Sequence, residues 1–299
     1  WPHKEVIVVD DGSTDGTVAA ARKSQSRGVN VVPRSHPRWL AQGEIIQWLD
    51  ADDLLAPDKI ELQIREGGLL DDPRTLVSSS WGRFFRFPDR ARFHPDGLWE
   101  DLAPAEWMLR KLDQNLWMAI NAWLMSRQLA DGAGPWNPEL RRDNDGEYFC
   151  RVIRQASRIR FVGQARCFVR RANQASISNT RTLSRAKVES LLQSLSLHVQ
   201  HMRALEDSER SRAACARLLQ RWFIYFYPEH PDLVQQLSGL ARSFGHELKT
   251  PTLRWPYRMV QKTLGWHAAK RLLFRGPKVR GFLAQARECL LTSPAKAGY

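Results

Sequence analysis

Short apolar runs alternate with amphipathic segments over the first part of the chain. The runs are rich in β-branched residues and predict strands over residues 5–9, 29–32, 44–49 and 76–80, with helices over 14–23 and 57–66 between them. Such alternation is typical of a mainly parallel sheet with helices on both faces. We therefore expect an α/β fold in which the run at 5–9 is a buried strand.

The patterning is less regular up to about residue 180. Residues 81–103 are rich in proline and aromatic residues and predict a loop over the sheet edge. The pattern then predicts a helix over 105–112, a strand running into a helix over 117–127, a helix over 145–155 and one or two strands over 159–169. From about residue 182 the spacing is helical, and one apolar stripe is formed by Leu191, Leu192, Leu195, Leu197, Val199 and Met202.

The charge changes at the same place as the pattern. The 299 residues carry a net charge of +13, but residues 1–180 contribute only +1 and residues 181–299 contribute +12. We therefore predict a neutral unit over 1–180 and a helical basic extension over 181–299. Twelve tryptophans and a hydrophobic fraction of 43% are typical of a folded protein. The four cysteines lack metal-ligand spacing, which indicates reduced thiols, and no apolar run approaches the ~20 residues that span a bilayer.

Carboxylates gather where two of the predicted strands end. Asp10 and Asp11 follow the strand at 5–9, and Asp50, Asp52 and Asp53 follow the strand at 44–49. Like charges this close repel one another and have no use in a core, so they indicate a bound cation or a polar ligand. Because ligands of parallel sheets bind outside the carboxyl ends of the strands, both clusters are expected in one crevice.

The same segments resemble family 2 glycosyltransferases. Residues 5–17, Glu-Val-Ile-Val-Val-Asp-Asp-Gly-Ser-Thr-Asp-Gly-Thr, are similar to the family's nucleotide-binding segment. Residues 48–53, Trp-Leu-Asp-Ala-Asp-Asp, followed by Pro-Asp-Lys at 57–59, resemble its DxD metal motif. The resemblance implies a GT-A-like nucleotide-binding fold and an inverting, metal-dependent transfer of a sugar from a UDP- or dTDP-sugar to a glycan, lipid-linked or other hydroxyl acceptor.

Roles for the acidic residues follow from the resemblance. Asp10 and Asp11 are expected to contact the nucleoside, with helix-capping and turn chemistry as the alternative. Asp52 is the expected ligand of Mg²⁺ or Mn²⁺, which fits the preference of these ions for a few carboxylates plus phosphate and water oxygens. Asp50 is expected to touch the ribose or metal-bound water, and Asp53 to cap the following segment.

A third acidic segment supplies the expected base. Residues 140–151 resemble the family's acidic segment that opens a helix, and this match places the base at Asp145, with Asp143 and Glu147 as alternatives. These acids also suit the first turn of a helix, and both interpretations hold together. A single base without a nucleophilic partner implies one displacement, and therefore inversion at the anomeric carbon.

Four further side chains are weaker candidates. Arg170 and Arg171 follow the last predicted strand, where the family often contacts the diphosphate, although its usual histidine is absent and a solvated basic turn is the alternative. Trp81 and Trp136 either stack on a sugar ring or belong to the core. The family's first strand, which ends in Pro-x-Tyr-Asn, is not found before Trp1, so we expect a chain truncated at its N-terminus.

The basic extension suggests a location. Between Lys249 and Arg287 there are ten Lys and Arg residues, no acids and many interleaved aromatic and leucine residues. This composition suits either an interfacial helix on anionic lipid or the solvated basic face of a helical bundle. We expect a cytoplasmic protein that sits peripherally on the inner face of the membrane, and no nucleic-acid partner, because no DNA- or RNA-binding motif accompanies the charge. The alternative function is a non-catalytic nucleotide-sugar-binding or membrane-docked scaffold protein.

Overall fold

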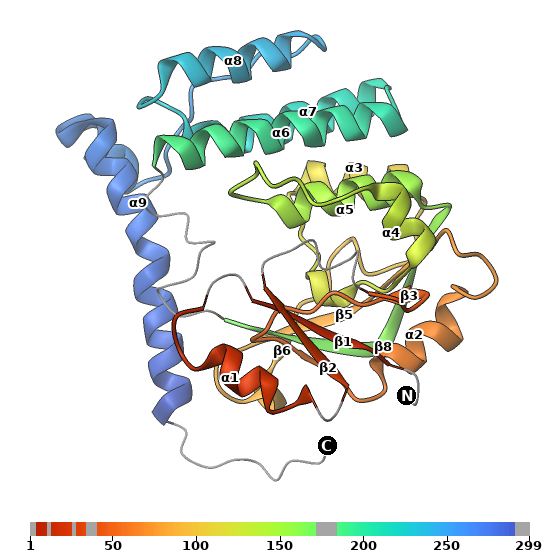
Figure 1. Ribbon diagram of the computed structural model, residues 1–299. Coiled ribbons are helices and arrows are strands. Elements are labelled where there is room, and N and C mark those ends of the chain that lie inside the picture. The colour runs from red at the N-terminus through yellow and green to blue at the C-terminus, as the bar shows by residue number, and fades with distance from the viewer. Residues whose placement is uncertain (1–3, 11–12, 26–27, 34–40, 172–183, 291–299) are drawn as a thin grey trace.

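A layer of strands lies between two groups of helices in the computed structural model (Figure 1). The structure describes residues 4–10, 13–25, 28–33, 41–171 and 184–290, with side chains up to residue 274. In Figure 1, α1 and α2 lie on one side of the strands and α3, α4 and α5 on the other, with α6, α7 and α8 stacked beyond α3 and α5. The helices are α1 (Thr17–Arg22), α2 (Lys59–Gly67), α3 (Pro104–Gln114), α4 (Arg127–Ala133), α5 (Asn144–Gln155), α6 (Arg185–Leu205), α7 (Glu209–Trp222), α8 (Pro231–Arg242) and α9 (Tyr257–Leu290).

The strands form both parallel and antiparallel pairs. The long strands β5 (Thr75–Phe84) and β8 (Arg158–Arg170) pair in parallel, flanked by the antiparallel edge strands β4 (Leu54–Leu55) and β6 (Arg92–Phe93). Two further pairs are β1 (Val6–Asp10) with β2 (Val29–Pro33), parallel, and β3 (Ile45–Ile46) with β7 (Met125–Ser126), antiparallel. The expected α/β class with mainly parallel pairing is therefore confirmed, since the two longest pairings are parallel and the antiparallel pairs are short.

Two predicted strands differ from the expectation. The run at 44–49 forms only the two-residue β3, because the chain leaves the ladder where the Gln47 amide binds the carbonyl of Trp48 at 2.5 Å. The strand at 5–9 is present but not buried, since Val6 is 40% exposed and the rest of β1 is half-buried. Helix α1, the next element along the chain, has no buried residue, so it does not seal this strand from solvent.

The segment expected to be a loop over the sheet edge begins as a strand. β5 continues through Phe84, and Gly82 makes room for β6, because a Cβ at this glycine would lie 2.7 Å from the Phe93 ring. The predicted strand-to-helix passage at 117–127 is present in that order but short. There β7 is followed directly by α4, whose first turn is capped by Ser126 accepting from the Leu129 amide at 3.0 Å.

The helical extension shares the core of the strand-containing part. The predicted stripe on α6 is buried at Leu191, Leu192, Leu195, Val199 and Met202, whereas Leu197 is only half-buried. These residues belong to one apolar cluster that runs from Ile46 to Phe244. The predicted boundary near residue 180 lies outside the described residues. None of the helices in the described part of the chain combines the length and apolar composition that crossing a bilayer requires.

Candidate active site

The three carboxylates of the acidic turn after β3 differ in how deeply they are buried. Asp50 and Asp52 are exposed, whereas Asp53 is only 7% exposed. The Asp53 carboxylate accepts from the Arg170 amide at 2.8 Å and from the side-chain amide of Asn121 at 3.1 Å. The expectation that Asp53 caps the next segment is therefore wrong, because its oxygens join the turn to the end of β8 instead.

Electrostatics links this turn to the third acidic segment. Loss of hydration raises the pKa of Asp50, although much of the residue is exposed, and the charges of Asp52 and Asp145 raise it further. Burial also raises the pKa of Asp53, to about 7, against the opposing hydrogen bond from the Arg170 amide. Because charges act on one another only over short distances in salt solution, Asp145 lies near enough to Asp50 for its charge to be felt there.

Arg170 lies directly against the acidic turn. Its guanidinium donates to the carbonyls of Asp52 at 3.0 Å and Phe85 at 3.1 Å, and it stacks over Phe84 with 4.5 Å to the ring centroid. Arg171 stacks instead over Phe85, with 5.1 Å to the centroid. The structure thus brings Arg170 to the strand-end carboxylates and places Arg171 beside a different ring.

A buried lysine lies behind the turn. Lys59 is fully buried, and its ammonium donates to the side-chain oxygens of Gln47 and Gln63, both at 2.6 Å. Gln47 donates in turn to the Asn121 carbonyl at 3.1 Å, and Asn121 donates to Asp53. Burial lowers the pKa of Lys59 to about 7, with an opposing contribution from Cys167. This chain of hydrogen bonds fixes the backbone on either side of the turn that carries Asp50 and Asp52.

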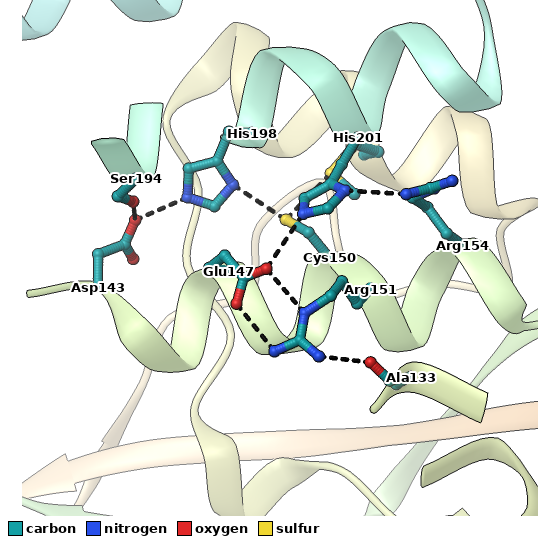
Figure 2. A network of polar contacts seen from close by, with 10 residues as sticks. Ala133, Asp143, Glu147, Cys150, Arg151, Arg154, Ser194, His198 and His201 are labelled. Atoms are coloured by element: carbon teal, nitrogen blue, oxygen red, sulfur yellow. Dashed lines mark hydrogen bonds and ion pairs between the residues drawn. The ribbon is translucent and has the colours of Figure 1, made fainter. Parts of the chain in front are cut away.

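Two of the three acids of the third segment, Asp143 and Glu147, have separate protein partners (Figure 2). The Asp143 carboxylate lies 2.6 Å from both Ser194 Oγ and His198 Nε2. The carboxylate of Glu147 is 3% exposed and accepts from Arg151 Nε at 2.7 Å and Nη2 at 2.9 Å. Neither of these acids is available to a substrate, because each is already paired in the interface between α5 and α6.

His201 adds a further partner to the buried acid of α5. Its Nε2 lies 3.2 Å from the Glu147 carboxylate, and its Nδ1 lies 3.1 Å from Arg154 (Figure 2). Burial raises the pKa of Glu147, but the hydrogen bonds from His201 and Arg151 outweigh it and lower the value overall. Glu147 therefore stays ionised and bound, and does not compete with Asp145 as a base.

Asp145 is the acid of this segment that lines a pocket. The pocket is a small, partly open depression with room inside for about one water molecule, and its lining consists of Trp107, Lys111, Trp117, Met118, Trp123, Asp145, Gly146, Phe149 and Cys150. Burial and then the charge of Asp143 raise the pKa of Asp145, against opposing contributions from Lys111 and the Trp117 indole. A raised pKa suits a carboxylate that takes up a proton.

Other candidates are placed less decisively. Asp10 ends β1 and accepts from the Ser13 amide at 3.1 Å, while Asp11 lies outside the described residues. Trp81 is 9% exposed and contacts Trp117 edge to face at 4.8 Å, so it belongs to the core. Trp136 is half-buried and stacks on Tyr148 at 4.4 Å, which leaves that face of its ring occupied.

Comparison with known families gives one match. Residues 1–128 match the family described as Glycosyl transferase family 2. Over this segment the chain is similar to glycosyl transferase family 2. No curated protein matches the chain in sequence.

Two solved structures resemble the chain weakly. TarS of S. aureus is 16% identical, with a TM-score of 0.43, and the match covers 81% of this chain but 47% of TarS, so the chain spans about half the length of that protein. The mannosyltransferase PcManGT of Pyrobaculum calidifontis, solved with GDP-Man and Mn²⁺, is 17% identical, with a TM-score of 0.44. That match covers 97% of this chain and 79% of PcManGT.

The acidic turn is an open donor set rather than a closed metal cage. Within the described ranges, no group of three or more His, Cys, Asp or Glu side chains is arranged to hold a metal ion. Asp50 and Asp52 are exposed oxygen donors at one turn, and Asp53 is already bonded to protein groups. This set fits an Mg²⁺ or Mn²⁺ ion that completes its shell with phosphate and water oxygens.

Sequence reasoning missed several polar residues around the site. His198 and His201 lie on the apolar stripe of α6, and this helical spacing was a usable signal that both are buried. Lys59 and Gln63 are one turn apart on α2, which was a weaker signal of a buried pair. Asn121 had no signal, because its role depends on a short turn that meets β5, β8 and the acidic turn only in three dimensions.

Proposed function

We propose that this chain is an inverting glycosyltransferase that moves a sugar from a nucleotide-diphosphate donor to a hydroxyl acceptor. The similarity of residues 1–128 to glycosyl transferase family 2 supports the reaction class. The observation that carries the proposal is the electrostatic contact of Asp50 with Asp145, which sets the acidic turn opposite a carboxylate that lines a pocket. In this proposal the donor at the acidic turn and the acceptor at Asp145 lie next to one another.

Asp145 acts as the general base. Its carboxylate takes the proton of the acceptor hydroxyl while that oxygen forms a bond to the anomeric carbon on the face opposite the diphosphate. The bond between the anomeric carbon and the diphosphate oxygen breaks in the same step, so the configuration inverts. The raised pKa of Asp145, caused first by burial and then by Asp143, makes the carboxylate a better proton acceptor.

The donor binds along the acidic turn. Asp52 would hold Mg²⁺ or Mn²⁺, and a bound divalent ion neutralises the charge that develops on the departing diphosphate. Asp50 is proposed to accept from ribose hydroxyls, and Arg170 adds positive charge beside the turn. Asp10 and Asp11 are proposed to contact the nucleoside of a UDP- or dTDP-sugar.

The acceptor hydroxyl approaches Asp145 at the mouth of the pocket. Trp117 is half-buried there, whereas Trp107 and Trp123 are 2% and 1% exposed and belong to the core beneath. A glycan or lipid-linked glycan presents a ring that can contact Trp117 together with the hydroxyl that attacks. Trp117 and the neighbouring carboxylate thus support a carbohydrate acceptor.

Transfer assays with purified full-length chain test the proposal. We expect turnover of a UDP- or dTDP-sugar in the presence of Mn²⁺, and a loss of about 10²–10⁴-fold in kcat for Asp145→Asn. Asp131→Asn, an exposed carboxylate on α4, is the matched control and keeps full activity. Asp52→Ala is expected to lose the Mn²⁺ dependence. Donor binding without product from any of these proteins would support a non-catalytic nucleotide-sugar-binding protein instead.

The start of α9 and the segment before it form a surface suited to anionic lipid. Of the eight large apolar residues that are most exposed, four lie here: Trp255 (74%), Met259 (49%), Leu264 (72%) and Leu272 (44%). We call these four residues, with the exposed Arg254, Arg258, Lys262 and Arg271 between them, the basic apolar surface. Apolar side chains interleaved with cations fit the boundary of an anionic membrane.

The part of α9 that follows the non-helical Gly265 packs against the protein, which corrects part of the sequence interpretation. Trp266 contacts Tyr227 edge to face at 5.2 Å, and Phe274 stacks on Tyr225 at 5.2 Å. Lys270 is 7% exposed and donates to the Tyr227 carbonyl at 2.9 Å. These residues anchor α9, so among the described side chains of this segment we propose lipid contact for the basic apolar surface and not for them.

Sedimentation with vesicles tests this surface. We expect binding to phosphatidylserine-containing vesicles, weak binding to phosphatidylcholine alone, and loss of binding in the variant Trp255→Ser, Met259→Ser, Leu264→Ser. Leu70→Ser is the control, because Leu70 is also 72% exposed but lies outside the basic apolar surface. Equal binding by the triple variant and this control would refute the proposed membrane contact.

A further inference from the structure

The helical extension holds Asp143, the residue that precedes α5, through polar contacts. Asp143 has a left-handed φ of 56°, which is uncommon for a residue other than glycine. Its carboxylate is held at 2.6 Å by both Ser194 and His198, which come from α6 (Figure 2). Its backbone carbonyl accepts from the Glu147 amide at 3.0 Å and so closes the first turn of α5. The conformation of this turn is therefore set partly by the helical extension.

Gly146 leaves the space that the Asp143 carboxylate needs to make these contacts. A Cβ at this position would lie 2.1 Å from Asp143 Oδ1, so the Asp143 carboxylate occupies the surface of the first turn of α5. Gly146 also lines the pocket, next to Asp145. A shift of the Asp143 carboxylate therefore passes directly to the backbone that carries Asp145.

His198 is anchored at both ring nitrogens. Its Nδ1 lies 3.0 Å from the Cys150 sulfur, further along α5, while its Nε2 faces Asp143. Burial alone lowers the pKa of His198, but Cys150 and Asp143 raise it to about 10, so the imidazole is charged at neutral pH. The same ion pair outweighs burial and keeps the pKa of Asp143 well below its usual range.

We propose that His198 and Ser194 are positioning residues for Asp145. They hold Asp143 in its left-handed conformation, which fixes the first turn of α5 and directs the Asp145 carboxyl into the pocket. Asp145 is a base only if the proposed function holds, whereas the geometry of α5 does not depend on it. The extension is thus part of the catalytic apparatus and not only a basic appendage.

Kinetics of a matched serine pair tests the catalytic side. Ser194→Ala removes a hydroxyl from Asp143, whereas Ser196→Ala removes one that bonds only within its own helix, to the Leu192 carbonyl at 2.9 Å. We expect Ser194→Ala and His198→Gln to lower kcat about tenfold or more with an unchanged donor KM, because the base is misplaced. Ser196→Ala is expected to behave as wild type. Equal kcat values for all three variants and wild type would overturn the positioning role.

The pH profile separates positioning from simple loss of folded protein. Asp145 faces Asp143 on its own helix, Lys111 on α3 and Asp50 on the acidic turn. His198→Gln leaves the Asp143 charge without its cation, so the acid limb of kcat/KM is expected to move to higher pH. A merely destabilising change lowers activity without moving that limb.

Hydrogen exchange of the Glu147 amide gives a readout independent of catalysis. Because this amide donates to the Asp143 carbonyl, its protection reports the first turn of α5. We expect lower protection in Ser194→Ala than in Ser196→Ala, and this comparison remains valid if His198→Gln does not fold. Unchanged protection overturns the proposal. Reduced protection in a protein without transferase activity would refute the proposed function and leave the role of α6 in place.

Discussion

The Asp53 carboxylate accepts a hydrogen bond from the backbone amide of Arg170 at 2.8 Å, across 117 positions of the chain. This bond joins the acidic turn after β3 to the last residue of β8. It also distinguishes Asp53 from its neighbours, because the Asp53 carboxylate is buried and hydrogen-bonded within the protein while Asp50 and Asp52 stay exposed. The stability of the turn and its chemistry therefore depend on different side chains.

Replacing Asp53 should damage the fold, and replacing Asp52 should not. Asp53→Ala leaves the buried Arg170 and Asn121 amides without their acceptor, so we expect a loss of about 2–4 kcal/mol in the free energy of unfolding. Asp52→Ala removes an exposed side chain and should change it by less than about 0.5 kcal/mol. Urea denaturation measures both. Similar losses in the two variants would mean that the burial difference does not govern the turn.

Buried Lys59 should make stability depend on pH. Its native pKa is near 7, against 10.5 for an unperturbed lysine, so the unfolded chain binds more protons between these values. The free energy of unfolding should therefore rise with pH through this window, by about 2 kcal/mol between pH 7 and pH 9. Lys59→Met should lack this contribution. Parallel pH slopes for the wild type and the variant, measured by urea denaturation, would contradict a shifted lysine.

Gly146→Ala should destabilise the protein, although alanine is ordinarily the better helix former. The new Cβ would lie 2.1 Å from Asp143 Oδ1, and relief of such a contact costs about 1–3 kcal/mol. Gly239, inside α8, has nothing within 4 Å of the equivalent point. Gly239→Ala should therefore stabilise by about 0.5–1 kcal/mol. Thermal unfolding of both variants measures whether each substitution raises or lowers stability. A stabilised Gly146→Ala protein would show that the Asp143 carboxylate does not occupy that space.

Lys111 should set the lower pH limit of activity. Its charge favours the ionised form of Asp145, whose pKa is raised by burial and by Asp143. Lys111→Met should raise that pKa further, so the acid limb of kcat/KM moves to higher pH by roughly half a unit or more. Lys249→Met, an exposed lysine of the extension, is the control. If the acid limb of kcat/KM does not move in Lys111→Met, the charge of Lys111 does not influence the pKa of Asp145.

Local signals in the sequence were sufficient for much of the architecture. The helices at 57–66, 105–112 and 145–155 correspond to α2, α3 and α5, because apolar spacing and first-turn residues act within one element. The similarity of residues 1–128 to glycosyl transferase family 2 also followed from contiguous motifs, which need no long-range contact to be recognised. Strands were harder, since β3 and β7 depend on partners far away in the chain.

Only the tertiary structure decided which acid does what. By sequence, Asp143, Asp145 and Glu147 are equivalent carboxylates at the start of one helix. Packing of α6 against α5 pairs the outer two with His198 and His201 and leaves Asp145 lining the pocket. The ionisation and access of a carboxylate depend on burial and on the charges brought beside it, and these neighbours are set by the fold rather than by adjacent residues.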